Sequence, residues 1–491
     1  SYFQSSIASG TPQSKRLRLD KIYDVNPSNV NTELPGHVFT YNTTYTMPPR
    51  TSYAHDYLGY NNGSYNSSIT NPEPKYYFKN NEVLPFFDSA AIYLTGNYSL
   101  EANENYCKTY SLTKIKFPTG GTNEYEYELN EFNYSGTRLG GGLRIKSQKI
   151  TDDKGNEQIL DYEYGTGYIE RMPDYAVFKL KNTNWNWASN PTSLSQLVSY
   201  FGIDTFMTPQ SQVELTHGSF VGYSSVTVRD RVANGKSVYQ YSNPSTYPNI
   251  ASSKTSSGSS YGNSWLLIGP PSLSANRDFR RGKPTWETVY DHNNNIRLQK
   301  RYVYTYKEFS TLSLSHLNKA STLFSESSSC WPGNGDQYAT SSCGAFTENL
   351  NLPIARDLLT TVWTTDYTNG ASQDPFKVSY SYTYDKQFPL ILNETKSVEV
   401  CEPTVQGGEH LCIPVEGLHE TGYSKTITYP ITGGNTMQSN VISSMPLASD
   451  LVNLNRLSTP LTINSPSGTE EKHYYKNFGY NIIALEKIDF V

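Results

Sequence analysis

The residues of this 491-residue chain that are best suited to redox or metal chemistry are five cysteines and eight histidines. Cys330 and Cys343 flank one turn-rich loop, and Cys401 and Cys412 flank another. We predict a local disulfide across each loop, with Cys107 left over, and an oxidising compartment. Buried free thiols remain the alternative for all five cysteines. A zinc site is not favoured, because no C-x-x-C motif and no paired histidine accompanies the cysteines.

No set of residues in the sequence has the spacing of a catalytic or metal site. The histidines form no H-E-x-x-H motif, and no G-x-S-x-G element supports a serine triad. The segment DHNNN, at 291–295, places oxygens at alternate positions but lacks the glycine and the glutamate of an EF-hand loop. We interpret this segment as a turn, and we predict no catalytic residue, no metal and no cofactor.

A triple glycine, Gly140, Gly141 and Gly142, raises the question of a phosphate-binding loop. Such loops require G-x-x-x-x-G-K-[ST], or G-x-G-x-x-G leading into a helix, whereas these glycines lead into the strand-like run LRIKSQKI. We therefore predict a bulge or sharp strand entry with positive φ. Gly120 and Gly121, in the phrase PTGG, predict a hairpin turn.

Two tryptophans, Trp185 and Trp187, stand at i and i+2, so a strand would place both rings on one face. Such a pair is a candidate platform for a glycan or another partner. The alternative is that both rings cover the core or the inside of a shell.

The composition favours an extended, turn-rich β protein. Tyrosine is unusually frequent, with 41 residues, and only 17% of the residues are charged. The net charge of −5 gives no support for nucleic acid binding, and no apolar run is long enough for a membrane-spanning helix. Because the sequence starts and stops in strand-like text, we expect a piece of a longer chain.

The strand patterns recur in a fixed phrase: a strand, a polar turn with Asn or Gly, and a strand that ends in Tyr-x-Tyr. Examples are KITDDKGNEQILDYEY, VRDRVANGKSVYQY and TVYDHNNNIRLQKRYVYTY. This self-similarity predicts an all-β fold of consecutive antiparallel hairpins added to one large sheet. We expect one continuous region over residues 1–491, interrupted by irregular insertions near 172–212, 245–277, 313–350 and 401–418.

Three phrases resemble the region that precedes the core of RHS/YD-repeat proteins of Bacteroidota: YAHDYLGYNNG, SLTKIKFPTGGTNEYEYELNEF and GGGLRIKSQKITDDKGNEQILDYEYGTG. The resemblance implies long, spiralling antiparallel sheets that can close into a hollow shell, in some members around a C-terminal toxin. It also implies export to the cell surface or the medium, often through the type 9 secretion system. The repeat core and the self-cleavage signature of better-known members are not found in this sequence.

The functional hypothesis is therefore a non-catalytic scaffold of an exported RHS/YD-repeat protein, with a toxin-enclosing shell as its specific form. Its partners would be the rest of its own chain or a C-terminal effector. The alternative is an adhesin or binding module for glycans, outer-membrane proteins or secretion-system proteins. A glycan-active enzyme would need two carboxylates that meet in space. A shell predicts a cavity lined by tyrosine, and an adhesin predicts an exposed aromatic patch.

Overall fold

The structure is a computed structural model of residues 1–491. It describes residues 2–4, 12–26, 29–64, 76–78, 92–94, 99–134, 136–173, 175–180, 201–205, 215–251, 253–256, 266–267, 274–319, 323–324, 345–367, 376–384, 390–403, 410–414, 424–428, 462–464, 469–477 and 483–490.

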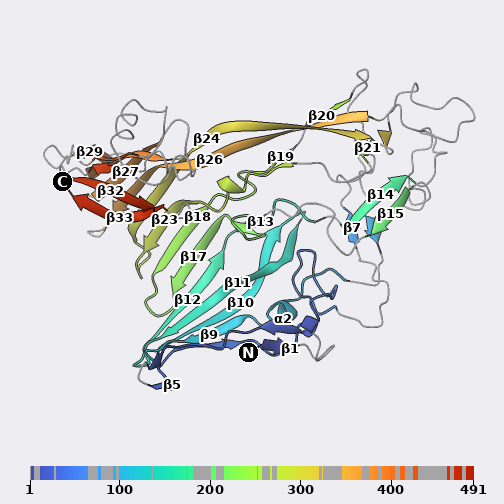
Figure 1. Ribbon diagram of the computed structural model, residues 1–491, viewed down its shortest axis with the longest axis horizontal. Helices are drawn as coiled ribbons and strands as arrows, with labels where there is room; N and C mark the ends of the chain where they lie inside the picture. Colours follow the sequence, from blue (N-terminus) through green and yellow to red (C-terminus); the bar gives the residue numbers. More distant parts are fainter. Residues whose placement is uncertain are drawn as a thin grey trace, which may run out of the picture.

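One large antiparallel sheet dominates the described chain, and its strands follow one another almost in sequence order (Figure 1). The series runs β3 (Lys21–Ile22), β6 (His37–Tyr41), β9 (Leu112–Lys116), β10 (Thr122–Asn133), β11 (Thr137–Thr151), β12 (Glu157–Tyr164), β17 (Ser225–Asp230), β18 (Lys236–Tyr241), β23 (Pro284–Tyr290), β24 (Ile296–Lys319), β26 (Ala345–Asp366), β27 (Phe376–Tyr384), β28 (Ile391–Pro403), β30 (Ser424–Thr428), β31 (Thr462–Asn464), β32 (Glu470–Asn477) and β33 (Ile483–Phe490). The prediction of an all-β fold of consecutive antiparallel strands is confirmed.

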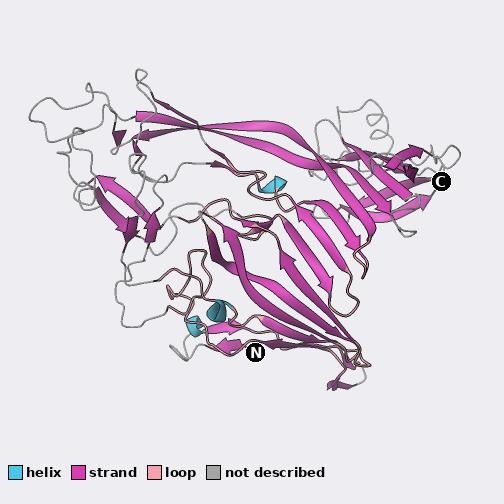
Figure 2. Cartoon of the chain, turned by 180° about the vertical axis from the view of Figure 1, so that it is seen from behind, coloured by secondary structure: helices cyan, strands magenta, loops and turns pink. Residues whose placement is uncertain are grey.

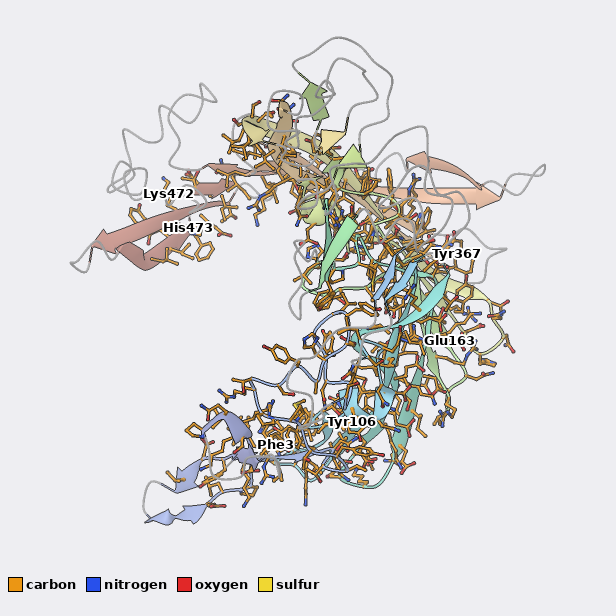
Figure 3. The ribbon with its side chains drawn as sticks, turned by 90° about the vertical axis from the view of Figure 1, so that its right-hand side faces the viewer. Phe3, Tyr106, Glu163, Tyr367, Lys472 and His473 are labelled. Carbon is orange, nitrogen blue, oxygen red and sulfur yellow. The ribbon has the colours of Figure 1, made fainter. Side chains whose placement is uncertain are left out.

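The sheet is a curved, open wall. Seen from the side, it follows a C, with the strands near the N-terminus at one tip and the strands near the C-terminus at the other (Figure 3). Among the described strands no pairing joins β3 to β33. Four short strands branch from the series: β13 (Gly167–Tyr168), β16 (Gly222–Tyr223), β20 (Ser253–Ser256) and β29 (His410–Pro414).

In its described part, the sheet is one layer thick. Figure 2 shows the strands from behind with no second sheet across them, and the described helical turns are short: η1 (Pro12–Ser14), α2 (Glu104–Cys107) and η2 (Asp278–Arg280). Every side chain of β17 is half-buried, and β18 and β23 are nearly the same. A sheet with one covered face would alternate between buried and exposed residues. Here both faces are similarly open.

The main apolar core lies at one edge of the wall rather than beneath its centre. It consists of Leu58, Phe132, Ile169 and Val221, with the half-buried Tyr57, Tyr134, Met172, Phe220 and Tyr223 packed around them. These residues join a loop at 53–63 to the turn end of the β10–β11 hairpin. We call this contact region the junction.

The predicted insertions contain regular structure where they are described. The β24–β26 hairpin continues to Lys319 and restarts at Ala345, inside the range 313–350. The other three ranges hold strands as well: β14 (Ala176–Leu180) with β15 (Phe201–Thr205), β19 (Ile250–Ala251) with β22 (Ser274–Ala275), and β29 with the end of β28. Further two-stranded pairs are β1 (Tyr2–Gln4) with β2 (Lys15–Leu17), β4 (Val25–Asn26) with β5 (Asn29–Glu33), β7 (Tyr76–Phe78) with β8 (Ile92–Leu94), and β21 (Leu266–Leu267) with β25 (Leu323–Phe324).

Candidate functional site

Two hairpins of the sheet end in the same five-residue turn, which begins with an aspartate. In the turn after β11, Oδ1 of Asp152 accepts hydrogen bonds from the backbone N–H groups of Lys154 (2.9 Å) and Asn156 (2.8 Å). Gly155, in the fourth position, has φ of +88°. The turn after β23 repeats these contacts from Asp291, with Asn294 in the left-handed conformation. The segment 291–295 is therefore a turn held by its own aspartate, as the sequence indicated.

The same turn recurs inside the loop 53–63, where it is buried. Oδ1 of Asp56 accepts from the N–H groups of Leu58 and Tyr60, both at 2.9 Å, and Gly59 has φ of +91°. The backbone N–H of Asp56 also donates to the carbonyl of Tyr60 at 2.7 Å, as Asp152 does to Asn156 at 3.0 Å. Asp56 is only 3% exposed. The turn that ends two exposed hairpins is thus buried against the sheet at this place.

Burial reverses the effect of this turn on the acidity of its aspartate. Hydrogen bonds from Asn295 hold the pKa of Asp291 down at about 2, and those from Asn156 lower the pKa of Asp152. Desolvation raises the pKa of Asp56 to about 6, although its Oδ1 accepts the same backbone hydrogen bonds. Removing the carboxylate from water therefore outweighs the turn's own stabilisation of the charge.

The triple glycine leaves the space in which this turn packs. In the β10–β11 register, Leu129 pairs with Leu143 and Glu131 with Leu139, so three glycines oppose one residue, Asn130. The glycines at 140, 141 and 142 have φ of +143°, +72° and +89°. The side-chain amide of Asn130 donates to the carbonyl of Gly141 at 2.9 Å and so bridges the bulge.

A side chain at these glycines would collide with the docked loop. A Cβ atom on Gly142 would lie 2.6 Å from Cζ of Tyr60, and one on Gly141 would lie 3.0 Å from Leu58. At the hairpin turn after β9, Gly120 has φ of +98°, and a Cβ on Gly121 would meet the carbonyl of Thr151 at 2.9 Å. The glycines of the bulge thus provide the space into which the loop packs.

A polar network behind the bulge is centred on the hydroxyl of Tyr223. This hydroxyl accepts from Arg144 (3.0 Å) and from the backbone N–H of Glu131 (3.3 Å), and it donates to Oδ1 of Asn130 (2.9 Å). Arg144 also donates to Glu128 at 2.7 Å. The network ties β16 to β10 and β11, so it holds the bulge open in a fixed shape.

A cavity of about 410 Å³ lies beside the docked turn. Its lining combines two carboxylates and a guanidinium with apolar walls; it consists of Asp56, Tyr57, Leu58, Leu100, Glu101, Ala102, Phe132, Thr137, Arg138, Leu139, Gly140, Gly141 and Met172. Within the described ranges no three His, Cys, Asp or Glu side chains group into a metal site. The thiol of Cys107 has its pKa raised to about 12 by burial and by Asp56, so it stays protonated near neutral pH.

The Tyr-x-Tyr phrases place tyrosines on one face of the wall. Residues two apart share a face, and the cross-strand registers align them; the set is Tyr125, Tyr127, Tyr162, Tyr164, Tyr239, Tyr241, Tyr302, Tyr304, Tyr380, Tyr382 and Tyr384. All are half-buried. We call this set the tyrosine face.

The tyrosine face is turned towards the hollow of the C. Glu163 belongs to the opposite face because it alternates with Tyr162 and Tyr164, and Tyr367 does too because its hydroxyl donates to Gln299, at 3.0 Å. Figure 3 draws Glu163 and Tyr367 on the outer side of the C. The tyrosines therefore line the inner side.

Several residues singled out in the sequence lie outside the described part of the chain: Trp185, Trp187, Cys330 and Cys343. Cys401 and Cys412 are direct cross-strand partners in the backbone register of β28 and β29. Cys107 is free and half-buried. In the described ranges no helix is both long and apolar enough to span a membrane.

The sequence analysis did not predict the roles of Asp56, Asn130 and Tyr223 at the bulge. One signal was available for Asp56, because HDYLGY and TDDKGN share an aspartate followed by a glycine three residues later. Nothing in the sequence pairs Asn130 with the bulge, since the bulge depends on the register of two strands.

No protein-family model matches the sequence, and no curated protein matches it. Among solved structures, the chain is similar to a TcdB2–TccC3 complex (10% identity, TM-score 0.29), to that complex without its hypervariable C-terminal region (10%, 0.31), and to a Tc holotoxin pore of Photorhabdus luminescens (8%, 0.29). The matches cover 77%, 82% and 77% of this chain but only 15%, 18% and 14% of those chains. At such TM-scores the likeness has no bearing on the function proposed below.

Proposed function

We propose that this chain is a non-catalytic wall segment of an exported RHS/YD-type protein that encloses its contents. The observation that supports this function is the curved, one-layer sheet, whose inner face is lined by tyrosines. A sheet normally buries at least one face against a second layer. A wall without such a layer needs either closure around an interior or contents that cover its inner face.

The chemistry of the tyrosine face suits an interior surface. Each ring is partly covered by its cross-strand neighbours, and several hydroxyls are bonded within the wall, such as those of Tyr302 to Glu287 and of Tyr384 to the carbonyl of Leu359. Burial raises the pKa of Tyr304 and of Tyr384 to about 12, so neither ring carries a charge near neutral pH. A neutral, amphipathic lining can hold an enclosed chain through many weak contacts without binding one sequence.

The finer parts of this proposal rest on the sequence resemblance alone. They are an origin in Bacteroidota, export to the surface or the medium through the type 9 system, and a C-terminal effector as the enclosed partner. An adhesin remains the second candidate function, and an aromatic surface on the outer face favours it, as described in the next subsection.

The wall proposal predicts a difference in access between the two faces of the sheet. Ser237 lies two residues before Tyr239 and so shares the tyrosine face, whereas Ser379 pairs with Trp363 on the outer face. In the protein encoded by the complete reading frame, a long polyethylene-glycol maleimide should modify Ser379→Cys quickly and Ser237→Cys slowly. In the isolated 491-residue chain, both should react. Labelled peptides quantified by mass spectrometry give the rates.

A small maleimide provides the control, because it should reach both cysteines in either protein. Equal rates for the long reagent at both positions of the full-length protein would rule out an enclosing wall.

The backbone register supports a disulfide between Cys401 and Cys412, and we propose that this bond closes the β28–β29 hairpin in the exported protein. The two residues lie directly opposite each other in an antiparallel pair, where Cα atoms are about 4.5–5.5 Å apart. This separation is within the range of disulfides. Nonreducing peptide mapping should recover the two cysteines in one linked peptide, and Cys107 as a free thiol. Alkylation of both residues without prior reduction would contradict the bond.

A further inference from the structure

The outer face carries a row of side chains that the wall function does not use. In the registers of β23, β24 and β26, Trp286 pairs with Arg301, and Arg301 pairs with Trp363. The guanidinium of Arg301 lies 5.3 Å from the ring centroid of Trp286 and 5.2 Å from that of Trp363. The cation is thus held between two indoles, which stand about 9.5 Å apart by strand spacing.

This row lines a shallow cavity of about 240 Å³. The neighbouring row on the same face supplies the polar part of the lining, with Gln299, Thr365 and Lys377. Both tryptophans are half-buried, and Arg301 is exposed. The cavity is smaller than a typical drug-sized site of about 300–1,000 Å³, so it suits a single small ring.

The described lining of the cavity contains two cationic side chains, Arg301 and Lys377, and no carboxylate. Among the described residues no carboxylate forms an ion pair with Arg301, whereas its counterpart Arg229 on the same face is paired with Glu163 at 3.6 Å. Because two rings already hold the guanidinium in place, binding a ligand costs it little further conformational freedom. Its N–H donors match the geometry of a carboxylate. An anion is therefore the ligand group that best complements this guanidinium.

A peptide backbone cannot be recognised by strand addition at this place. β23, β24, β26 and β27 are all paired on both sides, so no free edge is available for an added strand. Recognition must come from side chains alone. Indole faces stack against the C–H faces of sugar rings, amide and hydroxyl groups bond sugar hydroxyls, and a cation binds a sugar carboxylate.

We propose that Trp286, Arg301 and Trp363 form a binding site for an acidic saccharide of the uronate or sialate class. The sugar ring stacks on an indole, and its carboxylate pairs with Arg301. Gln299 and Thr365 bond the ring hydroxyls, and Lys377 adds to the positive charge.

The test is a binding titration of the 491-residue chain with oligogalacturonate and sialyllactose, followed by tryptophan fluorescence. Methyl-esterified oligogalacturonate and lactose are the neutral counterparts. The acidic ligands should bind at least about tenfold more tightly than the neutral ones, as expected for one charge-assisted contact. Arg301→Gln should remove this preference, and Arg301→Lys should retain part of it.

Arg229→Gln is the matched control, since it removes the same charge from the same face outside the cavity. It should leave binding unchanged. Trp363→Ala should weaken both acidic and neutral ligands, and its thermal unfolding, compared with that of Arg301→Gln, separates a lost contact from a lost fold. Equal affinity for acidic and neutral sugars, no saccharide binding, or binding of an acidic peptide in their place would overturn the proposal.

Discussion

Replacing Gly142 with alanine is expected to detach the loop 53–63 from the sheet. The substitution forces a left-handed residue with a Cβ, at about 1–2 kcal/mol. It also drives that Cβ into the ring of Tyr60, 2.6 Å away, and overpacking of this kind costs about 1–3 kcal/mol. We expect a combined loss of about 2–5 kcal/mol at the junction. Faster amide hydrogen exchange at residues 57–60 is the direct measurement.

Gly155→Ala is the matched control for this experiment. Gly155 has nearly the same φ, +88° against +89°, but a Cβ there would meet no atom within 4 Å. The stability lost in Gly155→Ala should be limited to the cost of a left-handed backbone, about 1–2 kcal/mol. Amide hydrogen exchange at residues 57–60 should be unchanged. Equal effects from both substitutions would show that the ring of Tyr60 does not rest on the glycine.

Replacing Asp56 with asparagine is expected to stabilise the chain at neutral pH. The side-chain oxygen can still accept from Leu58 and Tyr60, while the buried charge disappears. Folding raises the pKa of Asp56 from its ordinary value of 3.8 to about 6, which corresponds to about 3 kcal/mol. The stability that the neutral carboxyl of Asp56 contributes is fully present below the unfolded pKa of 3.8. It is lost as pH rises through about 6. The gain from asparagine should therefore appear between about pH 4 and pH 7.

Denaturant unfolding of the wild type and the variant across that range gives the difference. Asp291→Asn should behave in the opposite way, because folding lowers the pKa of Asp291 to about 2, so its charge stabilises the fold above pH 3.8 and that stability is lost at lower pH. Asp56→Ala separates charge from hydrogen bonding, since it removes both, and should destabilise the turn at every pH. A pH-independent difference for Asp56→Asn would mean that the carboxylate is well solvated.

The repeated phrases of the sequence predict most of the strands of the wall. They predict little of the packing between the loop 53–63 and the β10–β11 hairpin. Alternation in DYEY or VYQY is local, so it predicts strands and places Tyr162 and Tyr164 on one face without knowledge of their partners. Turn residues such as those at 152–156 are local too. Whether Asp56 is exposed or buried depends on a bulge more than 80 residues further along the chain, and its pKa depends on that burial.

The Trp286–Arg301–Trp363 row was equally hidden in the sequence. Its members are separated by 15 and 62 residues, and only the two registers bring them into line. Trp185 and Trp187 were conspicuous because they are neighbours in sequence, and proximity in sequence is a weak guide to which rings share a surface.

The near-sequential strand order also has a consequence for how such a wall is built. Strands β9 to β12 pair one after another in sequence order, and so do β23, β24, β26, β27 and β28, whereas β12 pairs with β17 and β18 with β23 across longer connections. A chain that emerges from a ribosome or a translocon can therefore add hairpins one at a time at a single advancing edge. Short loop closures make each addition within these two groups fast, and apart from the outer edge of β3 only the newest strand exposes unpaired N–H and C=O groups to other chains.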